Sequence, residues 1–177
     1  MQTEKRLPGF VAPMLAGASE AFDSDAHLFE VKWDGIRALA FVEGDGCRLV
    51  TRHRRDVTDA FPELEALARL RPGAVLDGEL VVLRDGVPDL GAVQSRQHTV
   101  DPLKLRGLAR TRPVTYVVFD LLYVDFRSVT VEPLLERRRR LREIVEGLDD
   151  PRFCSPKGSS ARAQRCSPKF VGWVWKG

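Results

Sequence analysis

The sequence predicts an α+β fold, in which antiparallel sheets are flanked by helices. Short apolar segments alternate with turns rich in glycine and aspartate, which is typical of antiparallel hairpins. A nearly continuous apolar run from Val114 to Leu122 indicates a strand buried on both faces. Apolar residues between Pro133 and Leu148 fall close to helical spacing, which predicts a helix there. The 177 residues are 44% hydrophobic, which is enough for the core of one domain.

The first half of the chain is expected to supply most of the strands. Leu28–Lys32 and Ala38–Glu43 have the composition of strands, and a turn at Gly44-Asp45-Gly46 leads into a third strand, Arg48–Thr51. The next expected elements are a short helix from Phe61-Pro62 to Leu70 that ends at Pro72-Gly73, strands at Ala74–Leu76 and Glu79–Leu83, a turn at Arg84-Asp85-Gly86, and a short helix at Gly91–Arg96.

The arginine run Arg137–Arg140 falls within the helix predicted between Pro133 and Leu148. We expect most of this run on the solvated side of the helix, with contact to DNA as the minority alternative. After Leu148 the composition shifts to Ser, Pro, Lys and Arg, and Cys-Ser-Pro-Lys occurs twice. Residues 1–148 are therefore expected to form the folded part of the chain, and residues 149–177 a poorly defined tail.

Charge, cysteine content and the lack of long apolar segments limit the partners and the cellular compartment that we expect. The net charge of +3, carried mainly by arginine, permits a polyanionic partner and favours two-pronged contacts to phosphate. The cysteines Cys47, Cys154 and Cys166 match no zinc-binding spacing and are expected to be reduced thiols. No segment has the apolar length of a signal peptide core or a membrane span, so we expect a soluble, cytoplasmic protein without a membrane partner.

Lys32 is the candidate nucleophile. It ends an apolar strand beside a turn that contains Gly35, where main chain can approach a ligand closely. Burial and neighbouring cations both lower the pKa of a lysine, and a neutral amine can attack a carbonyl carbon or a phosphorus atom. Strand alternation puts Glu30 and Lys32 on one face, so both are expected to face a single pocket. A lone lysine in a strand is usually a surface residue, so the other motifs decide the matter.

Five segments in order along the chain resemble the motifs of the covalent nucleotidyltransferases, which include ATP-dependent DNA ligases, RNA ligases and mRNA capping enzymes. They are Phe29–Ala38 with the upstream Pro13-Met14-Leu15-Ala16 (motif I), Leu49–Thr58 with Phe61-Pro62-Glu63-Leu64 (motif Ia), Val75–Val81 (motif III), Gly86–Leu90 leading to Gln94, and Tyr116–Tyr123 (motif IIIa). Chance is a poor explanation for five ordered matches. The motif I stretch is similar to that of bacterial end-joining ligases, and Trp33 favours a DNA ligase over an RNA ligase or capping guanylyltransferase.

This resemblance implies the adenylation-domain fold of the ligases, with a nucleotide held between sheets. Lys32 matches the lysine that attacks the α-phosphate of ATP, releases pyrophosphate and keeps AMP through a phosphoramide bond. Glu30 matches the position that contacts the adenine amino group. Phe119 matches the aromatic ring that packs on adenine, although a place in the hydrophobic core is an equal alternative for this residue.

The remaining matched residues imply contacts to the rest of the nucleotide. Arg37 and Arg52 match arginines that hold ribose or phosphate, with a surface position as the alternative for Arg52. Glu79 matches a carboxylate that helps organise Mg²⁺, with capping of a hairpin as its alternative. Asp34 is expected to support the motif I turn. The three histidines, His27, His53 and His98, suggest no metal site and are expected to be structural or exposed.

The resemblance stops before motif IV, motif V and the oligonucleotide-binding barrel of complete ligases, although Ser167–Gly172 is similar to a segment that often precedes motif IV. We therefore expect a truncated adenylation module that is weak or inactive as an isolated ligase. The expected cofactors are ATP and Mg²⁺, and the expected partners are nicked or broken double-stranded DNA and end-joining repair proteins. The alternatives are a non-catalytic remnant that binds nucleotide or DNA, an RNA ligase or capping-type enzyme, and a fragment without a stable fold.

Overall fold

The computed structural model describes residues 5–15, 22, 24, 27–44, 46–155 and 173–176, and its main feature is a seven-stranded sheet. The central strands run in the order β3-β2-β4-β6-β7, while β5 pairs with β4 and β8 pairs with β6. All these pairs are antiparallel except the parallel pair of β6 and β8. The strands are β2 (Ile36–Glu43), β3 (Gly46–Thr51), β4 (Ala74–Arg84), β5 (Val87–Pro88), β6 (Val114–Val124), β7 (Arg127–Ser128) and β8 (Phe153–Cys154).

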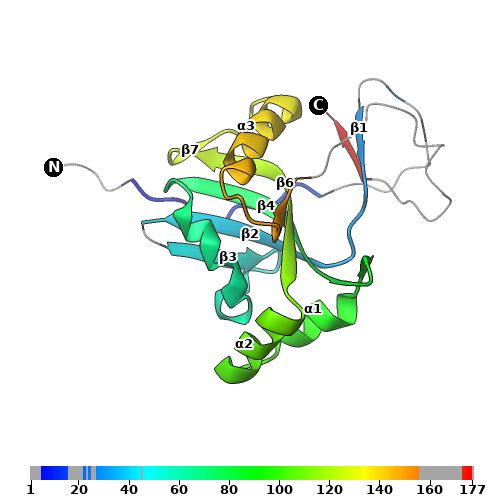
Figure 1. Ribbon diagram of the computed structural model, residues 1–177. Coiled ribbons are helices and arrows are strands. Elements are labelled where there is room, and N and C mark those ends of the chain that lie inside the picture. Colours follow the sequence, from blue (N-terminus) through cyan, green and yellow to red (C-terminus); the bar gives the residue numbers. More distant parts are fainter. Residues whose placement is uncertain are drawn as a thin grey trace.

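Helices flank this sheet, which confirms the predicted α+β class. Figure 1 shows α3 beside β6 and β7, and α1 and α2 at the opposite end of the sheet. The helical elements are η1 (Thr58–Ala60), η2 (Pro62–Arg69), α1 (Leu90–Gln97), α2 (Pro102–Thr111) and α3 (Leu134–Glu146). Helix α2 was not predicted from the sequence. Its start is marked by Asp101, whose side chain accepts hydrogen bonds from the main-chain N–H groups of Leu103 and Lys104.

The two segments predicted as separate strands around Asp77-Gly78 form one strand, β4, with irregular pairing to β6 at this point. Gly78 is required there because a Cβ atom would lie 2.6 Å from the Tyr116 ring and 2.5 Å from the Val117 carbonyl oxygen. The buried Tyr116 hydroxyl donates to the main-chain oxygens of Ala38 and Leu76 at 2.9 and 3.2 Å. This packing fixes how β4 presents Asp77 and Glu79 to the neighbouring strand β2.

The sheet has two apolar faces that are covered differently. One face packs on η2, α1 and α3 through residues such as Leu67, Val93 and Leu141. The other face, which carries Leu39 and Phe41, is covered by the N-terminal segment through Leu7. Since Arg37 lies two residues before Leu39 on β2, it shares this second face, beyond the apolar patch.

The structure corrects two expectations about the second half of the chain. Arg137 and Arg138 are buried in α3, so only part of the arginine run forms a solvated face. Residues 149–177, for which no regular structure was predicted, contain β8 and also β9 (Trp173–Lys176), which pairs with β1 (His27–Glu30) in a separate two-stranded sheet. Cys166 and Ser167–Gly172 lie outside the described residues. Across the described part of the chain, no helix combines the length and the apolar composition that a bilayer span requires.

Candidate functional site

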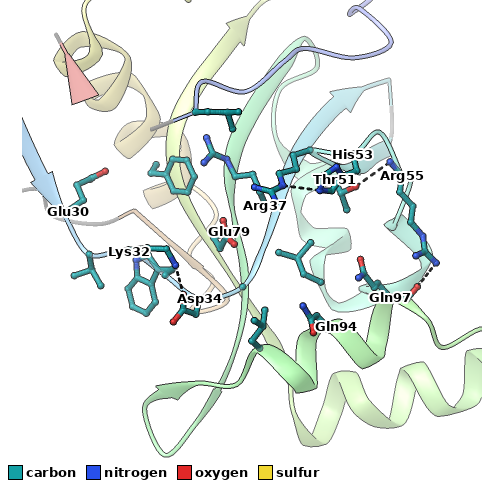
Figure 2. Close-up of a pocket in the computed structure, with 18 residues that line it drawn as sticks. Glu30, Lys32, Asp34, Arg37, Thr51, His53, Arg55, Glu79, Gln94 and Gln97 are labelled. Atoms are coloured by element: carbon teal, nitrogen blue, oxygen red, sulfur yellow. Dashed lines mark hydrogen bonds and ion pairs between the residues drawn. The ribbon is translucent and has the colours of Figure 1, made fainter. Parts of the chain in front are cut away.

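A cavity of about 570 Å³ opens at the end of the second sheet face, next to the segment that joins β1 to β2. Its walls come from that segment, from β2, β4, β6 and α1, and from the turn that follows β3. Figure 2 shows Glu30 and Lys32 on one side of the cavity, Arg55 and Gln97 on the other, and Glu79 between them. All six site residues predicted from the sequence line this cavity: Glu30, Lys32, Arg37, Arg52, Glu79 and Phe119.

Lys32 lies in the loop after β1, because that strand ends at Glu30 rather than continuing to Lys32. The expectation of a buried amine is wrong, since the Lys32 side chain is 38% exposed. Its Nζ atom lies 2.5 Å from Oδ1 of Asp34 (Figure 2). Asp34 therefore contacts the amine directly, in addition to its position in the turn.

Gly35 lines the cavity and also packs against β4, a contact that the sequence did not predict. A Cβ atom at Gly35 would lie 2.3 Å from the Leu80 carbonyl oxygen and 2.9 Å from Cγ of Glu79. No side chain fits at these distances. Glycine therefore lets the Lys32 loop pack directly against β4, and this brings Lys32 and Glu79 to the same cavity.

Arg37 joins the cavity to a buried carboxylate. Its Nε and Nη2 atoms donate to the two carboxylate oxygens of Asp77 at 2.6 and 2.7 Å, and Asp77 is almost completely buried. The Arg37 guanidinium also lies over the ring of Phe119, 4.3 Å from its centroid. Phe119 is half-buried and lines the cavity, so it is not simply a core residue.

Burial and neighbouring charges shift the pKa values of Arg37 and of the two carboxylates beside it. Burial raises the pKa of Asp77 to about 6, although Arg37 opposes this rise. Burial likewise raises the pKa of Glu79 to about 7, and again Arg37 is the main opposing influence. Burial alone would lower the pKa of Arg37, but hydrogen bonds and charge from Asp77 outweigh it and raise that pKa. Glu79 is therefore a wall residue whose charge changes near neutral pH.

Glu30 reaches the cavity wall from the end of β1, and its side chain is only 5% exposed. It forms an ion pair with Arg138 of α3, whose side chain is 4% exposed. Arg138 belongs to the run Arg137–Arg140, for which helical periodicity predicted a mainly solvated face, so periodicity does not predict this contact. A buried charge of this kind requires a counterion, and Glu30 provides it.

The turn after β3 supplies the predicted Arg52 and also two basic residues that were not predicted, His53 and Arg55. Arg52 and Arg55 both line the cavity, as does His53, which accepts a hydrogen bond from Nε of Arg52 at 3.0 Å. Arg55 donates to the Gln97 carbonyl oxygen at 2.9 Å, which ties the turn to α1. The signal for Arg55 was its position in the motif Ia segment, three residues after Arg52. The exposed position expected for His53 agrees with the structure.

These features define a site for an anionic ligand that carries a planar group. One lysine and three arginines (Lys32, Arg37, Arg52 and Arg55) supply donors for phosphate oxygens, and Phe119 supplies an aromatic face. The described residues contain no group of three or more His, Cys, Asp or Glu side chains that could hold a metal ion by themselves. This combination of cationic donors and an aromatic ring is typical of a nucleotide-binding site.

Comparison with known proteins identifies the family of this chain. Residues 12–161 match the family model described as ATP dependent DNA ligase domain, and the chain belongs to this family. It is 39% identical to DNA ligase C of Mycobacterium tuberculosis over 139 residues, which is 77% of this chain and 38% of that protein. It is also 38% identical to the multifunctional non-homologous end joining protein LigD of Pseudomonas aeruginosa, covering 96% of this chain and 20% of that protein.

Solved structures agree with the sequence relatives. The ligase domain of M. tuberculosis LigD matches with a TM-score of 0.69 and 31% identity, covering 87% of this chain and 48% of that one. A mycobacterial DNA ligase D complexed with ATP and MES matches with a TM-score of 0.68 and 30% identity over the same shares. The chain thus spans less than half the length of these relatives. The predicted family and its adenylation-domain fold are confirmed.

Proposed function

We propose that this chain binds ATP in the cavity and transfers AMP to Lys32, as the first step of DNA ligation. One observation carries the proposal: the loop lysine, the Arg37–Asp77 pair, Glu79 and Phe119 converge on one cavity in a chain of the ligase family. The ATP complex of the similar mycobacterial ligase supports the choice of nucleotide. Residues 1–148 would carry this nucleotide site.

The chemistry requires Lys32 to release Asp34. Nζ first gives up one proton of its ammonium group, and Asp34 Oδ1, 2.5 Å away, is placed to accept it. The neutral amine then forms a bond to the α-phosphorus while the bond from that phosphorus to the pyrophosphate oxygen breaks, and Nζ loses a second proton to water. The products are lysyl-AMP and pyrophosphate.

The arginines and Glu79 would act on the charge that develops during transfer. Arg52 and Arg55 face the cavity where a phosphate chain would extend, and positioned cations stabilise charge on phosphate oxygens. Mg²⁺, when bound, would neutralise part of this charge. Glu79 is the wall carboxylate that fits it, and phosphate oxygens and water would supply the other ligands, as this ion prefers.

The partners follow from the family. Nicked or broken double-stranded DNA would receive the AMP group, since the relatives are named DNA ligases and one is named for non-homologous end joining. End-joining repair proteins are proposed partners on the same ground, and the proposed site of action is the cytoplasm.

The test is to incubate the protein with Mg²⁺ and ATP labelled at either the α- or the γ-phosphate. We expect α-label to stay with the denatured protein and γ-label to leave as pyrophosphate. Lys32→Arg, which keeps the charge but removes the primary amine, serves as the matched control and should take up no label. Equal α-label on wild type and Lys32→Arg, or none on either, would contradict the proposal.

A further inference from the structure

Neighbouring arginines of α3 bind two elements, β6 and β1, that each contribute a residue to the cavity wall. Arg137 donates through Nε and Nη2 to the carboxylate of Asp120 on β6, at 2.8 and 3.0 Å, next to Phe119. Arg138 forms the ion pair with Glu30 at the end of β1. One helix therefore holds both the strand that carries the aromatic ring and the carboxylate that faces the same cavity.

The Arg138–Glu30 pair is nearly closed to water, with side chains 4% and 5% exposed. Burial, followed by the neighbouring charge of Arg142, lowers the pKa of Arg138 to about 10, so the guanidinium remains charged at neutral pH. Its three nitrogens form no hydrogen bond within the described residues, and Glu30 is the counterion that this part of the chain offers. A charge buried in this way fixes its partner's position and charge.

We infer that Arg138 is a positioning residue for Glu30, the carboxylate that the ligase resemblance places against the amino group at C6 of the purine. The inference rests on the proposed function, which puts a purine nucleotide in the cavity. An ionised carboxylate only accepts hydrogen bonds, so it can pair with an amino group but repels a carbonyl oxygen. Arg138 keeps Glu30 in this accepting form and at the cavity wall.

Loss of Arg138 changes what Glu30 can do. Without its counterion, a carboxylate at 5% exposure either turns towards water in the cavity or takes up a proton. A protonated carboxyl group can donate to a C6 carbonyl, so the distinction between the two purines is lost. Arg138 thus acts on the base through Glu30 and has no contact of its own with the reacting atoms.

The experiment compares AMP with IMP, which carries a carbonyl oxygen in place of the C6 amino group. Both lack a leaving group, so calorimetric titration reports binding without transfer. Wild type should favour AMP by about tenfold or more, the usual effect of one hydrogen bond to a charged group. Arg138→Met should reduce this ratio to about one, and Arg138→Lys, which restores the charge, should recover part of it.

Two controls separate positioning from structural damage. Arg139→Met alters the next residue of the same helix, whose partners Glu136 and Glu143 are on the surface, and should leave the AMP-to-IMP ratio unchanged. Glu30→Gln should lose the preference, because an amide can both donate and accept, and adding Arg138→Met to it should change the ratio no further. This double substitution removes both buried charges, so it remains informative if Arg138→Met alone fails to fold.

The outcomes distinguish this inference from the proposed function. An unchanged ratio in Arg138→Met, or a further change in the double variant, overturns the positioning role even when Lys32 takes up label. A lost ratio in a protein that never takes up label supports the positioning role and contradicts the proposed transfer. Absence of binding by either nucleotide contradicts both.

Discussion

Two bidentate pairs of arginine and carboxylate, Arg96–Glu63 and Arg37–Asp77, have similar geometry in different surroundings. Arg96 donates to the Glu63 oxygens at 2.5 and 2.7 Å, and Arg37 donates to the Asp77 oxygens at 2.6 and 2.7 Å. Arg96 is 2% exposed and faces only protein, while Arg37 is 13% exposed and lines the cavity.

The two pairs also differ in what surrounds them. Arg96 donates to the Ala60 carbonyl oxygen, and Glu63 accepts from the Val114 N–H, so this pair joins η2, α1 and β6 through buried hydrogen bonds. Both arginines lie over an aromatic ring, Phe61 for Arg96 and Phe119 for Arg37, but Arg37 lies beside two carboxylates whose pKa values are raised, Asp77 and Glu79. The same chemical pair therefore serves the framework in one place and prepares a site for a ligand in the other.

The largest expected effect on stability is at the Arg96–Glu63 pair. Arg96→Met leaves Glu63 buried without a counterion, and we expect the free energy of unfolding to fall by about 3–5 kcal/mol. Urea titration followed by circular dichroism measures this. Arg96→Met combined with Glu63→Gln should recover part of the loss. A loss below about 1 kcal/mol would show that the two pairs do not differ as described.

At the Arg37–Asp77 pair, the main effect should be on the rate of AMP transfer to Lys32. Arg37→Met should slow formation of lysyl-AMP by about 100-fold, the usual result of removing one positioned donor from a charged transition state. The free energy of unfolding should fall by only about 1–3 kcal/mol, because Asp77, with its raised pKa, can take up a proton. Rapid-quench labelling and urea titration test the two parts separately. Normal labelling in a destabilised protein would make Arg37 a framework residue as well.

Replacing Glu79 with glutamine should raise the free energy of unfolding above neutral pH but lower nucleotide labelling. Its pKa is raised from 4.5 to about 7, so between these values the folded protein keeps a proton that the unfolded chain has lost. Stability from this group is therefore lost as pH rises from about 4.5 through 7. Glu79→Gln should be more stable than wild type by about 1–3 kcal/mol at pH 8 and equal to it near pH 4, while its labelling falls. Urea titrations from pH 4 to 8 would contradict this if the difference between the two proteins stayed constant.

The smallest effect is expected for an exposed pair. Arg139 bonds to Glu136 at 2.6 Å on the surface of α3, where water and salt screen the charges. Arg139→Ala should leave both the melting temperature and nucleotide labelling unchanged. A fall in the melting temperature as large as that for Arg96→Met would mean that exposure does not separate structural from surface arginines in this protein.

Most of the sheet could be predicted from the sequence because its signals are local. The glycine turn after Glu43 and the apolar run from Val114 predicted β2, β3 and β6 closely. The continuity of β4 could not be predicted, since Gly78 reads as a turn residue until Tyr116 is known to lie against it. The helix α2 was missed although Asp101-Pro102 is a cap signal of the ordinary kind.

The residues that line the cavity were predicted better than the buried partners that hold those residues in position. Motif spacing selected six residues that do share one cavity, because motif residues tend to face the ligand. The partners of buried charges could not be found in this way. Arg138 and Glu30 are far apart in sequence, and helical periodicity alone gives no sign that an arginine inside α3 has a carboxylate to meet. Contacts between elements, rather than patterns within them, decide which arginines are buried.

The central claim is tested most directly by locating the AMP group on the protein. After incubation with ATP and Mg²⁺, the protein is digested at neutral pH, which preserves a phosphoramide bond, and its peptides are sequenced by mass spectrometry. We predict a single AMP adduct on Lys32, absent from Lys32→Arg. An adduct on another residue, or bound ATP with no adduct at all, would contradict the account.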